Sequence, residues 1–94
     1  MKHHILVKWN DSVGDRLAMI PRVEEAFRDA VNIPGVSGCE VIPSCSDRPN
    51  RYDVMIRMEL TPEGLLNYDA SSMHKVWKEQ FTVYMASKAI FDCD

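Results

Sequence analysis

The sequence predicts an α+β domain of ferredoxin-like βαββαβ order, in which helices cover one face of a four-stranded antiparallel sheet. Two patterns indicate this fold. Apolar residues occupy every second position over residues 52–60, and apolar residues recur at helical spacing over residues 20–31. The chain has 94 residues, which is enough for one domain with a thin core. We therefore expect residues 1–94 to form a single domain.

The first strand is predicted at residues 3–9, where every second side chain faces the core. The inward-facing residues of this strand are His3, Ile5, Val7 and Trp9. A helix follows, with a core-facing stripe of Ile20, Val23, Phe27, Ala30 and Val31. Pro21 either kinks this helix or lies in its first turn, after a separate short turn around Gly14 to Met19.

The second strand is predicted at residues 36–42, because Pro34 and Gly35 end the preceding helix. A loop at residues 43–50 then leads to the third strand, residues 52–60. Thr61 caps a short helix that runs to about Tyr68. The last strand is predicted at residues 88–93. The helix before it has a stripe of His74, Trp77, Phe81, Tyr84 and Met85.

The composition excludes several classes of protein. Hydrophobic residues make up 46% and charged residues 27% of the chain, the balance of a globular protein. Because the net charge is -3, we expect no nucleic-acid partner. The apolar stretches are too short to span a bilayer and the first residues lack a signal-peptide pattern. We therefore expect no membrane attachment and a cytoplasmic location.

Cofactor motifs are also missing from the sequence. The cysteines, Cys39, Cys45 and Cys93, are odd in number and lack CxxC spacing, so they predict neither a disulfide framework nor a zinc site. The four glycines form no nucleotide-binding pattern. We expect a protein that works without metal or cofactor, while haem ligation through a lone histidine stays open.

The predicted sheet has a face without helices, and its residues predict a homodimer. A small sheet covered on one side exposes its other face unless a second chain covers it. Leu6 and Met55 fall on that other face. A two-fold copy of the chain would cover them.

Three polar residues are predicted to point into the apolar interior. His3 shares a strand face with core residues, His74 opens the stripe of the last helix, and Tyr68 ends the helix before it. In a shared cavity, one imidazole would take a proton from a carbon acid while Tyr68 or the second imidazole stabilises the enolate. The helix N-terminus next to His74 favours the neutral imidazole. The alternative is that His3 caps a strand end and His74 is a hydrogen-bonded residue at the edge of the pocket.

Six apolar residues are candidates for the wall of such a cavity: Ile5, Val7, Trp9, Phe27, Trp77 and Phe81. Aromatic residues at this spacing fit an ordinary core equally well, so both interpretations stay open. A basic run of Arg48, Asn50 and Arg51 fits an acidic ligand, although a solvated loop is its ordinary interpretation.

The sequence resembles the stress-responsive A/B barrel family, a dimeric α/β barrel family, over nearly its whole length. The resemblance lies in HHILVKW at residues 3–9, IPGV at 33–36, YD at 52–53, and Tyr68 with His74 six residues on. It implies a dimer in which two four-stranded sheets meet face to face. Between Tyr68 and His74 the chain has DASSM where many relatives carry a His-Pro pair, and this changes the expected pocket mouth.

The resemblance also implies a function and roles for the residues. His3 would be the acid/base residue, with Tyr68 and His74 beside it, in a cofactor-independent cyclase or isomerase. Cyclases of the family close a linear polyketide thioester by aldol condensation, so the implied ligand is a small apolar carbonyl or polyketide-like compound. One alternative is a non-enzymatic dimeric module that binds an apolar metabolite or acts in the stress response. Another is a monooxygenase or haem-degrading enzyme.

Overall fold

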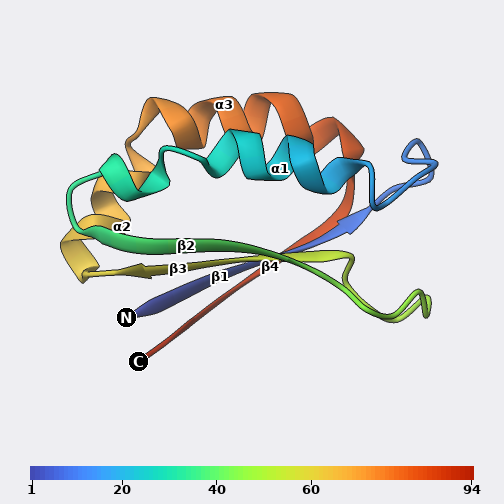
Figure 1. Cartoon of the computed structure of the whole chain (residues 1–94), viewed down its shortest axis with the longest axis horizontal. Helices are drawn as coiled ribbons and strands as arrows, with labels where there is room; N and C mark the ends of the chain where they lie inside the picture. Colours follow the sequence, from blue (N-terminus) through green and yellow to red (C-terminus); the bar gives the residue numbers. More distant parts are fainter.

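Two layers make up the structure, a four-stranded sheet and a set of helices on one of its faces (Figure 1). The computed structural model describes all 94 residues. The sheet order is β2-β3-β1-β4, and neighbouring strands are antiparallel. The elements in chain order are β1 (Lys2–Trp9), α1 (Met19–Phe27), the 3-10 helix η1 (Ala30–Asn32), β2 (Val36–Pro43), β3 (Val54–Leu60), α2 (Pro62–Asp69), α3 (Ser72–Phe81), the 3-10 helix η2 (Thr82–Tyr84) and β4 (Met85–Cys93). The predicted ferredoxin-like fold is confirmed.

The two central strands form the floor of the core. Burial alternates residue by residue along β1 and along most of β3, because successive strand side chains point to opposite faces. The buried residues of β1 are His3, Ile5, Val7 and Trp9, as the sequence predicts. Those of β3 are Val54, Ile56, Met58 and Leu60.

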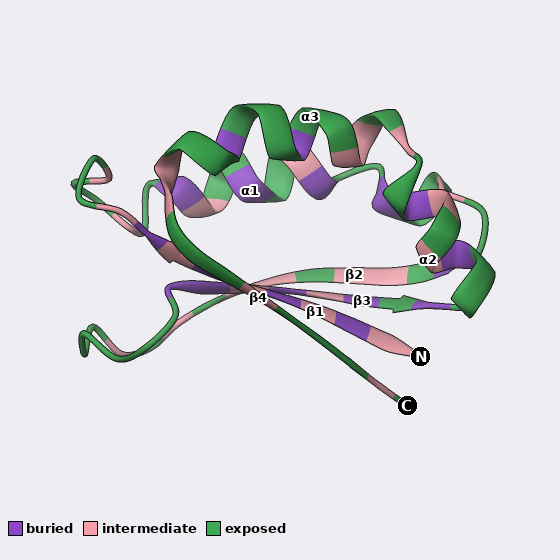
Figure 2. Ribbon diagram, turned by 180° about the vertical axis from the view of Figure 1, so that it is seen from behind, coloured by how far each residue is buried: buried purple, intermediate pink, exposed green.

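The helices α1 and α3 close the core from above. Met19, Val23 and Phe27 of α1 and Trp77 and Phe81 of α3 are buried against the sheet. Figure 2 shows buried segments on the facing sides of the two layers and no helix on the other side of the sheet. The chain therefore has one core and one bare sheet face. No helix is long and apolar enough to cross a membrane.

The start of α1 resolves the two interpretations of Pro21. The helix begins at Met19, so Pro21 lies in its first turn, where its missing N–H costs no helical hydrogen bond. Just before the helix, the Asp15 carboxylate accepts from the backbone N–H groups of Leu17 and Ala18. A separate short turn thus leads into α1, as one of the two interpretations predicted.

The predicted stripe of α1 is wrong at its end. The helix stops at Phe27, and Val31 lies in η1 with 51% of its surface exposed. A 3-10 turn has three residues per turn, so the helical spacing of the sequence no longer sets which side a residue faces. Ala30 of the same segment is nevertheless buried, as predicted.

The predicted stripe of the last helix is also too long. The helix α3 ends at Phe81, so Tyr84 lies in η2 and Met85 opens β4, three residues before the predicted strand start. Asn10 accounts for this, since its backbone N–H donates to the Tyr84 carbonyl at 2.8 Å and its side-chain amide donates to the Val83 carbonyl at 2.9 Å. These contacts bind the end of the helix to the loop after β1.

The predicted start of the third strand at Tyr52 is wrong. The strand β3 begins at Val54, and Tyr52 is 38% exposed. The buried carboxylate of Asp53 accepts from the backbone N–H of Trp9 at 2.8 Å and from Arg16 at 3.1 Å. These bonds hold the chain before β3 against the end of β1.

Candidate functional site

A buried histidine meets a carboxylate where β1 pairs with β4. His3 is 6% exposed, and its Nδ1 lies 2.5 Å from Oδ1 of Asp92. The two residues are direct partners in the β1–β4 register, so strand pairing itself sets the contact. Because an ionised carboxylate only accepts, Nδ1 of His3 is the donor, and Nε2 is the acceptor of the tautomer that this contact selects.

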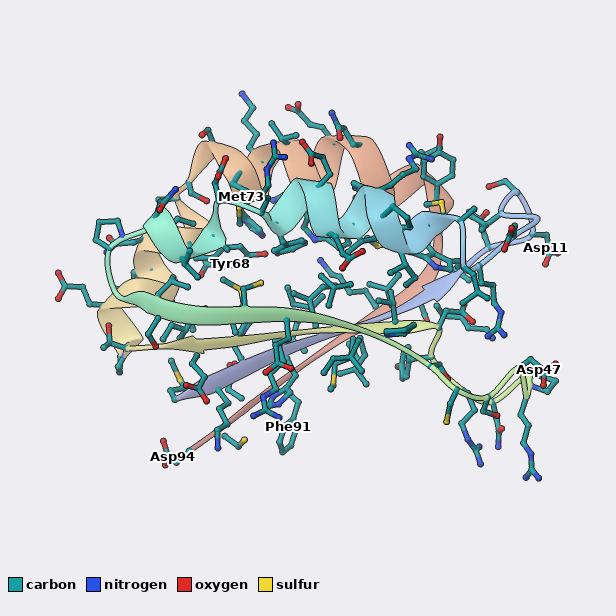
Figure 3. The ribbon with its side chains drawn as sticks, in the orientation of Figure 1. Asp11, Asp47, Tyr68, Met73, Phe91 and Asp94 are labelled. Atoms are coloured by element: carbon teal, nitrogen blue, oxygen red, sulfur yellow. The ribbon has the colours of Figure 1, made fainter.

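Tyr68 packs against His3 from the helical layer. It lies on α2, is 1% exposed, and its ring centroid is 5.9 Å from that of His3. Figure 3 shows its side chain between the helices and the sheet. Its hydroxyl is buried and has no hydrogen-bond partner. Leaving such a group unsatisfied costs about 1–3 kcal/mol. An oxygen atom of a ligand that accepted a hydrogen bond from this hydroxyl would remove that cost.

Burial raises the pKa of Tyr68 well above its ordinary value, and the nearby charges of Asp69 and Cys39 act in the same direction. The tyrosine therefore stays protonated over the physiological range. It can donate a hydrogen bond there, but it cannot serve as a base.

His74 contacts Tyr68 from the next helix. Their ring centroids are 4.7 Å apart. The Ser71 hydroxyl fastens this turn, since it accepts from the His74 backbone N–H at 3.1 Å and donates to the Tyr68 carbonyl at 2.6 Å. His74 Nδ1 lies 3.0 Å from the Asp69 carbonyl, which only accepts, so here too the proton is on Nδ1. The tautomer that this contact selects again leaves Nε2 as the acceptor.

The Tyr68 ring is thus the common neighbour of both imidazoles, and we call His3, Tyr68, His74 and Asp92 the Tyr68 cluster. The chain brings together the three polar residues that the sequence singled out. The cluster contains an oriented imidazole that can accept a proton and a phenol that can donate to an oxygen. These are the groups that proton transfer next to a carbonyl requires.

The expected open cavity is not present. The structure has four surface hollows, and none has His3, Tyr68 or His74 in its wall. Side chains fill the space, because the Tyr68 ring packs on His74 and, at 6.4 Å between centroids, on Phe27. The sequence could not foresee this, since cavity volume depends on how side chains interlock.

The candidate wall residues lie in the packed core. Phe27 and Trp77 meet edge to face with centroids 4.9 Å apart, and Trp77 packs on Phe81 at 4.7 Å. The core interpretation therefore describes the structure better than a cavity wall does. All six residues belong to the buried cluster: Ile5, Val7, Trp9, Phe27, Trp77 and Phe81.

One hollow comes close to the cluster. It has a volume of about 190 Å³, lies between α1 and β2, and has Phe27 and Cys39 in its wall. Phe27 contacts Tyr68, and the charge of an ionised Cys39 would act on Tyr68. Burial, followed by the charge of Glu40, raises the pKa of the Cys39 thiol to about 11, so the thiol is neutral at pH 7.

Sequence reasoning missed Asp92. The residue falls within the predicted last strand, but its neighbour depends on the register between the first and last strands. A slip of one residue would turn its side chain to the opposite face. Only the pairing of His3 with Asp92, which no sequence motif signals, identifies the carboxylate. No group of three or more His, Cys, Asp or Glu side chains is arranged to hold a metal ion.

No protein-family model matches the sequence, and no curated protein matches it. Solved structures do match the fold over nearly the whole chain. A dimeric protein of unknown function with a ferredoxin-like fold from Bacteroides fragilis NCTC 9343 is 18% identical with a TM-score of 0.83, and the match covers 99% of this chain and 93% of that one.

Two further matches are informative. A DABB family protein with a ferredoxin-like fold from Mesorhizobium loti is 15% identical with a TM-score of 0.74, over 99% of this chain and 93% of that one. The hydroxynitrile lyase from Passiflora edulis is 11% identical with a TM-score of 0.74, over 96% and 87% respectively. At these identities the matches establish a shared fold.

Proposed function

We propose that this chain is a cofactor-independent acid/base enzyme of the stress-responsive A/B barrel type, acting on a small apolar carbonyl compound as a cyclase, lyase or isomerase. The observation that carries the proposal is the Tyr68 hydroxyl, which is buried without a partner against an imidazole held by Asp92. Perturbed and unsatisfied groups of this kind gather at functional sites. A hydroxynitrile lyase with the same fold supports this class of chemistry, although a fold alone does not determine function.

The proposed step is proton transfer next to a carbonyl group. Nε2 of His3 takes a proton from the α-carbon, the C–H electron pair forms a C=C bond to the carbonyl carbon, and the carbonyl π pair moves to the oxygen to give an enolate. Asp92 stabilises the imidazolium that forms, because it already accepts from Nδ1. The Tyr68 hydroxyl donates to the enolate oxygen. The proton then returns from His3 to carbon or to a leaving atom.

The substrate must enter a site that is closed in the free chain. The hollow between α1 and β2 is the nearest way in, because Phe27 forms part of its wall and touches Tyr68. A rotation of the Phe27 ring would join the hollow to the cluster. Its volume of about 190 Å³ suits a benzene ring or a short alkyl chain, since a cavity of roughly 150 Å³ holds benzene.

We also propose that the protein is a two-fold homodimer formed through the bare sheet face. Ile42, Met55, Leu6 and Ala89 are paired neighbours across all four strands on that face. Dimeric proteins are among the structures with the same fold.

The test is exchange of carbonyl α-protons for deuterium, followed by proton NMR in deuterium oxide with acetophenone and short alkyl ketones. We expect Tyr68→Phe to slow exchange by about 10²–10³-fold, the usual loss for one oxyanion donor. The same variant should unfold no more easily than the parent, because it removes an unsatisfied buried hydroxyl.

Asp92→Asn should also slow exchange, because an amide no longer orients and stabilises the imidazole as a carboxylate does. Asp94→Asn is the matched control, with the same change two residues along the exposed terminus, and should keep the parent rate. Saturable binding of ketones to the parent without exchange would instead identify a binding module. Equal exchange by the parent and Tyr68→Phe would reject the assignment of the tyrosine.

A further inference from the structure

At the end of the bare sheet face that adjoins the loop between β2 and β3, away from Phe91 and from the Tyr68 cluster, lies a second hollow of about 230 Å³ that we call the basic hollow. Lys8 of β1 and Ser87 of β4 are direct partners in the strand register and form its floor. The loop between β2 and β3, which extends beyond the sheet and carries Asp47 in Figure 3, supplies the remaining wall. The residues of the wall are Lys8, Pro49, Asn50, Arg51, Tyr52 and Ser87.

The wall of this hollow contains two cations and no carboxylate. One carboxylate outside the wall contacts Lys8, that of Asp53, whose Oδ1 is 3.8 Å from the Lys8 ammonium. That carboxylate is buried and already bound more closely by Arg16, at 3.1 Å, and by the backbone N–H of Trp9, at 2.8 Å. Lys8 thus keeps hydrogen-bonding capacity that Asp53 does not use, and the charge in the hollow stays positive.

The guanidinium of Arg51 is held by a single hydrogen bond. One of its terminal nitrogens donates to the Asn50 side-chain oxygen at 2.6 Å, which leaves the other guanidinium donors free. The positive charge is local, since the chain as a whole has a net charge of -3. A guanidinium fork with an ammonium and a hydroxyl from a neighbouring strand is a donor set that suits a tetrahedral oxyanion.

We propose that the basic hollow binds a phosphoryl group, as free phosphate or as part of a small metabolite. Donors come to it from three segments of the chain, β1, β4 and the loop before β3, so they surround a tetrahedral group better than a planar one. The site is separate from the proposed catalytic cluster, which lies on the opposite face of the sheet. Binding there neither needs nor predicts turnover.

The test uses inorganic phosphate, titrated into the intact protein at constant ionic strength and followed by amide NMR. We expect saturable shifts in residues 48–52 and 87–88, with a Kd in the millimolar range. Arg51→Gln should weaken binding about tenfold, the effect of losing one charge-assisted hydrogen bond. Arg48→Gln is the matched control, because it removes the same charge from the same loop outside the wall, and we expect less than a twofold change.

The outcomes distinguish specific binding in the basic hollow from nonspecific electrostatic attraction to the loop. Shifts that never saturate, or equal losses in Arg48→Gln and Arg51→Gln, would mean that only the loop's overall charge acts and would overturn the proposal. Acetate should bind at least about tenfold more weakly than phosphate, and equal binding would overturn the phosphoryl assignment. Arg51→Lys should bind between parent and Arg51→Gln, because it keeps the charge and loses the fork.

Discussion

At the scale of single residues, Tyr68 combines a ring that stabilises the core with a hydroxyl that destabilises it. Its ring stabilises the core through contacts with Phe27, His3 and His74, and its hydroxyl remains without a partner. Phenylalanine at this position would keep the packing and remove the unsatisfied group. The cost of this unpartnered hydroxyl supports the proposal that it binds an oxygen atom of a ligand.

Cys39 gives a prediction for alkaline pH. Its thiol has a pKa of about 11 in the folded chain against an ordinary value of 9.0, because burial and Glu40 disfavour the thiolate. Between pH 9 and 11 the unfolded chain loses this proton while the folded chain keeps it, so rising pH favours unfolding. The free energy of unfolding should be fully retained below pH 9 and fall as pH approaches 11.

Urea denaturation at pH 8, 9, 10 and 11 measures this fall. Cys39→Ala should show a shallower decline than the parent, because the thiol no longer contributes. Cys45→Ala is the control, since Cys45 is exposed and lies in the loop after β2. If Cys39→Ala and the parent have the same slope, the buried thiol does not affect stability in this range.

At the scale of elements, the start of α2 packs directly on the turn that enters β2. Gly35 has a φ of +91°, a backbone conformation that residues with a side chain rarely adopt. Its carbonyl accepts a hydrogen bond from the Thr61 backbone N–H at 2.9 Å. Thr61 caps the helix by accepting from the Gly64 N–H at 3.0 Å. A Cβ on Gly64 would lie 2.4 Å from the Gly35 carbonyl oxygen. The atoms that a Cβ on Gly64 would meet belong to the backbone of Gly35, so no side chain can rotate to make room.

Gly64→Ala should therefore destabilise the protein by roughly 1–3 kcal/mol, the cost of overpacking, even though alanine favours a helix by up to about 1 kcal/mol over glycine. Gly14→Ala is the matched control. Nothing lies within 4 Å of a Cβ at that position, so the change should stay within about 0.5 kcal/mol. Thermal unfolding of both variants measures the difference, and a Gly64→Ala protein as stable as the parent would contradict the close contact.

The sequence predicts the strands better than the ends of the helices. Period-two alternation identifies which residues of β1 face the core. Shifting the alternation by one residue would expose every apolar side chain of that face, so only one assignment of the two faces is acceptable. Helical spacing fails at Val31 and Tyr84, where 3-10 turns take over. The bond from Asn10 to Tyr84, which helps to end the last helix, joins positions far apart in the sequence.

The same division applies to the candidate site. His3 and His74 could be singled out because each stands within an apolar pattern, and Tyr68 because it ends the helix just before His74. The structure brings the three side chains into contact. Asp92 could not, because its role depends on strand register. Nor could the closed site have been foreseen, because the contact of Phe27 with Tyr68 is a matter of side-chain packing.

At the scale of the whole molecule, the bare sheet face has features that support the proposed dimer. Phe91 protrudes from it with 61% of its surface exposed, and Figure 3 shows its ring on the side away from the helices. A hollow of about 170 Å³ on the same face has Leu6, Ile42 and Met55 in its wall. A protruding ring and an apolar hollow on one face are what a self-complementary two-fold contact needs.

Leu6→Asp tests this arrangement. The residue is half-buried at the centre of the face, between Met55 and Ala89, so in a dimer its carboxylate would be buried without a partner in both copies. An unpaired buried charge costs several kcal/mol, which weakens a dimer by roughly a hundredfold or more. In analytical ultracentrifugation at about 10 µM, we expect the parent to sediment as a dimer and Leu6→Asp as a folded monomer.

Leu66→Asp separates loss of the interface from a general effect of charge. Leu66 lies on α2, is 68% exposed and is remote from the bare face, and the substitution is the same. This variant should remain a dimer with the parent's stability. Circular dichroism must show both variants folded, because Leu6 also belongs to a central strand. A parent that sediments as a monomer, or equal dissociation of the two variants, would rule out dimerisation through this face.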